Sequence, residues 1–522
     1  MSAGEGSETA ARTDDDMLRQ SWWRPVTDAH MGMLAVAAVV GVWSTGRWWV
    51  FVMVAAPLLV VLHQLHVRLR RDLVVAAMVL MTFGSIVSAH AWTSAQPRTL
   101  GNFQGWATLV TDPAPLGFGA RVVMQIEGQR FDATVYGSAR RRLQARQAGD
   151  RVEVVGQRML ATGVWARRAQ VRHVVGDMAI DRIGGWAPGT ALSVASNRLR
   201  DALRVSAESA MAPDQAALFT GLVIGDDTRQ PATMIDQFRS SGLSHLTAVS
   251  GQNVAFVLAV VGIGLRALPR WSRLAATWAV VAWFVVLTRV EPSVLRAGTM
   301  AVMSATAFAL GRERTATRTL ALAVLALVLI DPLLVWSVGF WLSVGATFGV
   351  CAIAPLIEPR LAGPRWLAAP LSITLGAQVG VLAPTWLVFH RMPALGVISN
   401  LLAVPVAGFV MLYGIPAGLL AAVTPGGLPS VVDAAIMWPA TAGTRWVSTV
   451  AALAAQAEPS GWAAVACWTV QLATLVAVWR RPLQVAPDDR SYRVTPPMVV
   501  VVVNSSATHA EIDVASSLPP GV

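Results

Sequence analysis

Long apolar runs alternate with short polar linkers over most of the chain. After a polar segment over residues 1–30, these runs cover about 31–44, 48–63, 73–91, 246–267, 274–290, 294–311, 317–335, 336–357, 366–389, 395–424 and 461–480, with a weaker mixed segment at 431–457. A helix needs roughly 20 apolar residues to cross a bilayer, so we expect a polytopic α-helical membrane protein with about 10–12 transmembrane helices.

The apolar period changes to two over residues 97–190. Val122, Met124 and Ile126 lie two apart, residues 131–135 and 151–154 repeat the alternation, and turn signals separate the runs. This pattern predicts a small antiparallel β domain of about five strands. Its size suits an OB-like barrel, although periodicity does not choose among small barrels.

These patterns divide the chain into six parts. We expect a disordered cytoplasmic tail over 1–30, N-terminal transmembrane helices over 31–96, the inserted β domain over 97–190, amphipathic or interfacial helices over 191–245, a second group of transmembrane helices over 246–481, and a C-terminal tail over 482–522. The first two apolar runs are short and nearly adjacent, so they can form a tight helical hairpin.

Composition and charge agree with a membrane protein and predict its orientation. Charged residues make up 14% of the chain and mean hydropathy is +0.53, which excludes an ordinary soluble enzyme. The net charge is +11, and every basic residue is arginine. With the N-terminus inside, the arginine-rich linkers at 68–71, 266–273, 312–318 and 360–365 all lie on the cytoplasmic side. The protein is therefore expected in the cytoplasmic membrane, with the β domain outside.

The β domain is strongly basic. Residues 121–172 contain eleven arginines and four acidic residues, with aromatic residues between them. Arg140, Arg141 and Arg142 cluster between two predicted strands, and Arg151 begins the next. Basic and aromatic side chains together suit a single-stranded nucleic-acid groove, so these four arginines are candidate contacts. The alternative is that the aromatics fill a small core and the arginines are solvated.

One long polar string lies at the start of an apolar run. Residues 240–253 are rich in small and hydrogen-bonding side chains, and they include His245, Ser250, Gln252 and Asn253. Such a string predicts a broken or re-entrant helix whose backbone groups line a wet cavity. The alternative is the start of an interfacial helix.

Other polar residues lie inside apolar runs, where an ionisable group costs at least ~2.5–3.5 kcal/mol. Arg296 either extends to the membrane surface or faces the bundle interior and meets a polyanion. Ser343 lies in the small-residue segment 339–346, which is typical of close helix packing. Gln378 and Asn400 are single polar residues, which usually form interhelical hydrogen bonds.

Several strings together resemble the ComEC competence family, the inner-membrane channel for DNA uptake. They are Gly221–Asp226, Ser241–Gly251, Pro292-Ser293 with Arg296-Ala297, Gly311-Arg312, Asp331-Pro332, Gly339-Phe340 with Leu342-Ser343, Gln378, and Asn400–Pro405. The similarity covers about 33–425 and extends toward 480. This chain departs from the family pattern at Gln252-Asn253 and at Trp341.

The resemblance implies transport of single-stranded DNA across the cytoplasmic membrane during transformation, with 246–481 as the channel domain. The path or gate would contain His245, Ser250, Gln252, Asn253, Arg296, Ser343, Gln378 and Asn400. The implied partners are single-stranded DNA, membrane lipid, a separate DNA-receptor protein, a separate cytoplasmic motor, and a second copy in a possible homo-oligomer. The chain contains no P-loop motif, so ATP-driven pulling would need that motor.

We expect no cofactor, no metal and no enzyme activity. Many family members carry a metallo-β-lactamase-like domain, but this chain has no HxHxDH motif and its eight histidines are scattered. One alternative function is transport of another anionic polymer or a small solute, and another is a non-transporting relic. An intramembrane serine hydrolase using Ser250 and His245 is less favoured, because the two are only five residues apart on one segment.

Overall fold

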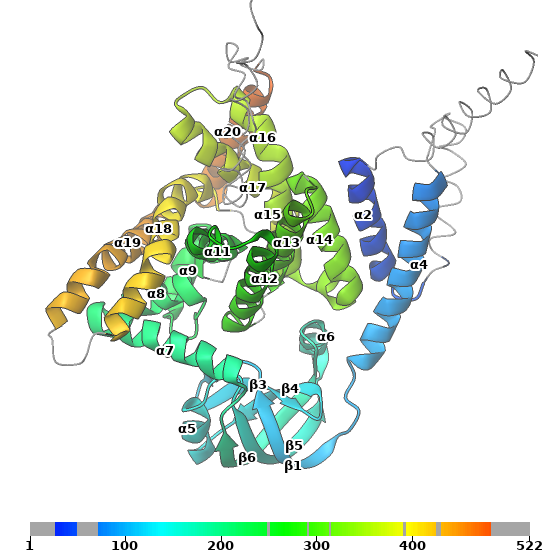
Figure 1. The fold of residues 1–522 in the computed structure, drawn as a ribbon, viewed down its shortest axis with the longest axis vertical. Coiled ribbons are helices and arrows are strands. Elements are labelled where there is room, and N and C mark those ends of the chain that lie inside the picture. Colours follow the sequence, from blue (N-terminus) through cyan, green and yellow to red (C-terminus); the bar gives the residue numbers. More distant parts are fainter. Residues whose placement is uncertain are drawn as a thin grey trace, which may run out of the picture.

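A computed structural model describes residues 27–47, 49, 71–247, 251–289, 292–312, 315–389, 393–423 and 430–481. Figure 1 shows a small β domain at one end and a larger group of helices above it. The helix α7 crosses the top of the β domain, and α6 rises from it toward α14. Three expected parts lie outside the described residues. They are the C-terminal tail, most of the N-terminal tail, and nearly all of the second apolar run with its proposed hairpin.

Helices form the larger part of the described chain. Their bounds are α2 Asp28–Ser44, α4 Arg71–Ser94, α7 Ala191–Ala210, α8 Pro213–Ile224, α9 Ala232–Ser240, α10 Ser244–Thr247, α11 Gly251–Leu265, α12 Arg270–Leu287, α13 Pro292–Ala309, α14 Ala316–Ile330, η1 Pro332–Trp336, α15 Val338–Phe348, η2 Gly349–Ile353, α16 Ala354–Ile357, η3 Glu358–Arg360, α17 Arg365–Phe389, α18 Gly396–Val423, α19 Ser430–Ala457 and α20 Gly461–Trp479. The apolar run at 395–424 forms the helix α18, and the mixed segment at 431–457 forms α19.

Five helical segments in the described part of the chain are long and apolar enough to cross a membrane. They are Asp72–Ser94, Val338–Arg360, Arg365–Val388, Gly396–Ala422 and Gly461–Trp479. This is fewer than the 10–12 expected. Helices such as α14, with 15 residues, extend only about 23 Å at 1.5 Å per residue, less than a bilayer core of about 30 Å.

The β domain is a sheet that closes on itself. Its strands are β1 Gly101–Leu109, β2 Ala114–Leu116, β3 Gly119–Ile126, β4 Gln129–Val135, β5 Arg151–Leu160 and β6 Val174–Ala187. The order is β1-β5-β6-β4-β3-β2, and β3 also pairs with β1. The β4–β6 pair is parallel and the other pairs are antiparallel.

Local sequence explains how the β domain folds. Val122, Met124 and Ile126 are all buried, which confirms the period of two. Glu127 and Gly128 connect β3 to β4 and both have positive φ, 49° and 82°, as a tight I′-type hairpin turn requires. The alternating side chains therefore fill one core inside the closed sheet.

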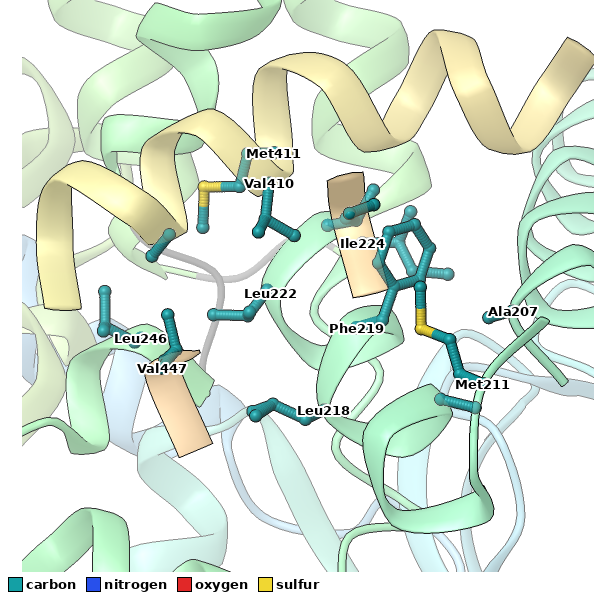
Figure 2. Close-up of a cluster of buried hydrophobic side chains, with 14 of the residues drawn as sticks. Ala207, Met211, Leu218, Phe219, Leu222, Ile224, Leu246, Val410, Met411 and Val447 are labelled. Atoms are coloured by element: carbon teal, nitrogen blue, oxygen red, sulfur yellow. The ribbon is translucent and has the colours of Figure 1, made fainter. Parts of the chain in front are cut away.

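Helix α8 is the centre of the helical core. Every residue from Ala216 to Ile224 is buried, as expected for a helix that is apolar on all sides. Figure 2 shows Phe219 and Leu222 packed among side chains of neighbouring helices, including Val410 of α18 and Val447 of α19. This packing fixes α7, α8, α18 and α19 as one unit.

Glycines allow the backbones of α15 and α17 to come into direct contact where the two helices cross. A Cβ atom added at Gly345 would collide with the carbonyl of Gly380, and one at Gly349 would collide with the carbonyl of Gly376. The prediction of close helix packing for the small-residue segment is thus confirmed, with α17 as the partner. The crossing holds α15 and α17 together in the wall of the cavity described next.

Candidate nucleic-acid path

A cavity of about 4840 Å³ lies between the β domain and the helices. Its wall includes residues of β4 and α6 from the β domain and of α10, α11, α13, α15, α17, α18 and α20 from the helical part. Eight arginines and three acidic residues line it, an excess of five positive charges. These arginines are Arg130, Arg167, Arg168, Arg172, Arg239, Arg266, Arg289 and Arg296. Arg239 and Arg289 pair with Asp236 and Asp112, two carboxylates outside the lining, which leaves an excess of three positive charges. The lining therefore suits an anionic occupant.

The three carboxylates of the cavity are engaged by other groups. His173 Nε2 lies 2.8 Å from a carboxylate oxygen of Asp331. Glu458 accepts hydrogen bonds of 2.5 and 3.2 Å from the backbone N–H groups of Ala394 and Leu395. Asp28 accepts from two threonine hydroxyls at the start of α14. None of these bonds engages a cavity arginine.

Arg296 lies on the helical side of the cavity and is 5% exposed. Its Nε donates a 2.8 Å hydrogen bond to Ser343 Oγ, and its Nη1 donates to Thr347 Oγ1. Among the described residues no carboxylate forms an ion pair with Arg296. The structure thus brings two predicted path residues together. Sequence reasoning missed Thr347, although its i+4 spacing from Ser343 places both hydroxyls on one face of α15.

His245, Gln378 and Asn400 also line the cavity. Asn400 Nδ2 donates a 2.6 Å hydrogen bond to the carbonyl of Gly396 in its own helix. Gln378 Oε1 and Asn400 Oδ1 are buried without a hydrogen-bond donor in the described part of the chain. Within the described ranges, neither side chain makes the interhelical hydrogen bond that an isolated membrane Gln or Asn usually makes.

The polar string before α11 is interrupted at residues 241–243, because α9 ends at Ser240 and α10 begins at Ser244. Residues 248–250, between α10 and α11, lie outside the described residues. Asn253 does not line the cavity. It is 2% exposed, and its Nδ2 donates to the carbonyl of Leu222 at 3.2 Å. Ser250 and the side chain of Gln252 lie outside the described residues.

The predicted arginine contacts of the β domain lie away from the cavity. Arg140, Arg141 and Arg142 belong to the helix α5 (Ser138–Gln144) between two strands, and none of them lines the cavity. Arg142 donates to the carbonyl of Ile183, and the Arg151 guanidinium lies 5.5 Å from the Trp106 ring centroid.

The β-domain arginines at the cavity come from another edge of the barrel. They are Arg130 on β4, Arg167 and Arg168 on α6 (Gly163–Val171), and Arg172 at the end of α6. Figure 1 shows α5 and α6 at different edges of the domain, with α6 toward the helices. The basic composition was visible in the sequence, but the edge that meets the cavity was not.

A buried ionic cluster joins the β domain to the helices. Asp112, in the loop between β1 and β2, accepts a 2.8 Å hydrogen bond from Arg289 and lies 3.4 Å from Arg200 Nη2. Arg200 also donates to the carbonyls that end α8 and α12, and Arg289 donates to Asn197 on α7. Burial alone would raise the pKa of Asp112, but the two guanidinium groups outweigh it and lower that pKa. No sequence pattern singles out Asp112 as a member of such a cluster.

No group of three or more His, Cys, Asp or Glu residues that could hold a metal ion occurs in the described ranges.

Comparisons with known proteins point to one family. The ComE operon protein 3 of Bacillus subtilis is 28% identical over 218 residues, covering 41% of this chain and 27% of that protein. The competence protein ComA of Neisseria gonorrhoeae is 29% identical over 271 residues, covering 48% of this chain and 37% of that protein. An uncharacterised Escherichia coli protein, YcaI, is 26% identical over 215 residues, covering 37% of this chain and 28% of that protein. The matches thus span less than two fifths of each relative.

No solved structure matches the chain. The family model described as competence protein matches residues 222–482, which is half of the chain and contains most of the cavity-lining helices. The chain therefore belongs to the competence protein family.

Proposed function

We propose that this protein passes single-stranded DNA across the cytoplasmic membrane, with the N-terminus in the cytoplasm and the β domain outside. Transport, rather than catalysis, is the activity proposed. A separate DNA receptor outside, a separate motor inside, membrane lipid and a possible second copy belong to the same proposal. Family membership and the large, arginine-lined cavity support it.

The observation that carries the proposal is the combination of Arg296 with this cavity. A buried guanidinium is costly unless an anion compensates it, and no described carboxylate does so. DNA presents a dense row of phosphates, so a path for it must be wet and partly cationic. The phosphodiester of a passing strand would supply the missing negative charge.

The β domain is proposed to be an OB-type barrel that receives the strand. Five strands in the order β1-β3-β4-β6-β5, closing back on β1 with one parallel pair, support this assignment. An OB fold binds ligands on its second and third strands and on the loops after the first and fourth strands. Here these are β3, β4 and the loops at 110–118 and 161–173, and the cavity lining draws on all four. The domain thus presents this surface to the cavity.

Replacing Arg168 and Arg172 together by glutamine is expected to weaken single-stranded DNA binding by the full-length protein in detergent. A plot of log affinity against log salt concentration has a negative slope. Each lost phosphate contact should make this slope shallower by about 0.7, so the double variant should make it shallower by about 1.4. The measurement is oligonucleotide binding by fluorescence anisotropy over a salt series.

Arg140→Gln with Arg141→Gln is the matched control, because it removes the same charge from α5, outside the cavity. Its salt slope should stay close to that of the wild type. Equal losses in the two double variants would show that only net charge matters and would contradict the assignment of the α6 edge.

A further inference from the structure

A second, smaller pocket lies where α2 ends, beside α4, α6 and η1. Its volume is about 480 Å³. Its lining combines tryptophans, arginines and small polar groups: Trp43, Ser44, Thr45, Arg47, Trp92, Gly163, Ala166, Arg167, Gln170 and Trp336. Two of these residues are positively charged and none is acidic.

A left-handed turn brings Arg47 to this pocket. Helix α2 ends at Ser44, and the next two residues, Thr45 and Gly46, have φ values of 46° and 79°. Ser85 of α4 holds the turn, since its hydroxyl accepts from the N–H of Gly46 at 2.9 Å and lies 3.0 Å from Ser44 Oγ. The turn is therefore fixed to α4.

Tryptophan rings position Arg167, the second arginine of the pocket. The ring of Trp336 makes edge contacts with Trp43 and Trp92, at centroid distances of 6.2 and 6.0 Å. The Arg167 guanidinium lies 4.9 Å from the Trp336 centroid and 5.2 Å from that of Trp92. Such cation–π contacts hold the charge over the rings and leave guanidinium N–H groups for an anion.

The pocket lies at the depth expected for lipid headgroups. Trp92 is in the last turn of the candidate span Asp72–Ser94, and Trp43 is exposed near the end of the apolar helix α2. Tryptophans concentrate at the membrane–water interface. The anions that a bilayer supplies there are lipid phosphates. The planar guanidinium group of arginine can donate two parallel hydrogen bonds to the oxygens of one phosphate.

We propose that this pocket binds the headgroup of an anionic phospholipid, with Arg47 and Arg167 on its phosphate. The ends of α2 and α4 contribute partial negative charges of about half a unit each, less than the two guanidinium charges together. Arg167 also lines the large cavity, but Arg47 and Trp43 lie only on the small pocket, at the ends of apolar helices. This placement favours lipid over DNA.

The test is native mass spectrometry of the full chain in neutral detergent with added phosphatidylglycerol or phosphatidylcholine. The wild type should retain phosphatidylglycerol in preference to phosphatidylcholine. Arg47→Gln should lower that retention several-fold, and Arg167→Gln should do the same. Arg98→Gln is the matched control, because Arg98 is exposed shortly after α4 and outside the pocket. It should leave retention unchanged.

Three results would overturn the proposal. Equal retention of the two lipids would remove the requirement for an anion. Unchanged retention in both pocket variants would place the lipid elsewhere. Arg47-dependent binding of a single-stranded oligonucleotide, or of soluble glycerol phosphate, without retention of phosphatidylglycerol would assign the pocket to that ligand instead.

Discussion

Arg296→Ala is expected to lower transformation frequency about 100-fold in competent cells that express the variant in place of the wild type. A hydrogen bond to a charged group contributes up to about 3 kcal/mol, which corresponds to roughly two factors of ten in rate. The loss follows because the guanidinium is the buried cation of the cavity without a carboxylate partner among the described residues. Transformation is measured with a single-copy marker, and membrane levels of the protein are checked by immunoblot.

Two further variants separate a role in the path from a role in stability. Arg296→Lys keeps the charge but lacks the planar guanidinium group that bonds both Ser343 and Thr347. This variant should therefore retain part of the transformation activity. Arg445→Ala removes an exposed arginine of α19 that does not line the cavity, and it should leave transformation unchanged. Normal transformation by Arg296→Ala would show that Arg296 has no role in the path.

Asp112→Ala should be the most destabilising of these substitutions. It leaves Arg200 and Arg289 buried without their shared carboxylate, and breaking a buried ion pair in this way costs about 3–5 kcal/mol. The free energy of unfolding is measured by denaturant titration of the purified protein in detergent. Asp181→Ala is the control, because Asp181 is exposed on β6 of the same domain.

The same cluster predicts a pH dependence. The pKa of Asp112 in the folded protein is below its ordinary value of 3.8. Its contribution to stability is therefore fully present at neutral pH and is lost only as the pH falls below 3.8 and through the folded-state pKa. The difference in stability between wild type and Asp112→Ala should be constant near neutrality and shrink in acid. A difference that is already small at neutral pH would contradict the buried ion pair.

Local patterns predicted most elements of this fold. The period of two at Val122, Met124 and Ile126 gave the β domain, and apolar runs such as 366–389 gave the helices within a few residues. The described residues contain fewer candidate spans than the sequence predicts, because apolar composition does not show where a short helix such as α14 ends. Hydrophobic pattern therefore predicted the type of each element better than its length.

The candidate site was only partly predictable. A charge in an apolar run is costly, which singles out Arg296 in the sequence, and its contact with Ser343 joins two of the predicted path residues. The cluster of Asp112, Arg200 and Arg289 could not be found, because its members are far apart in sequence and meet only when the β domain packs on α7. For the same reason, composition identified a basic β domain but not the edge that faces the cavity.

The most direct measurement of the central claim is the labelling rate of the two cysteines in the presence of DNA. Cys351 lines the cavity, whereas Cys467, the only other cysteine in the sequence, does not. The protein in lipid nanodiscs is treated with a maleimide, with and without a saturating single-stranded oligonucleotide. If single-stranded DNA occupies the cavity, labelling of Cys351 should slow several-fold while labelling of Cys467 is unchanged. Equal labelling of Cys351 with and without bound DNA would contradict passage of the strand through this cavity.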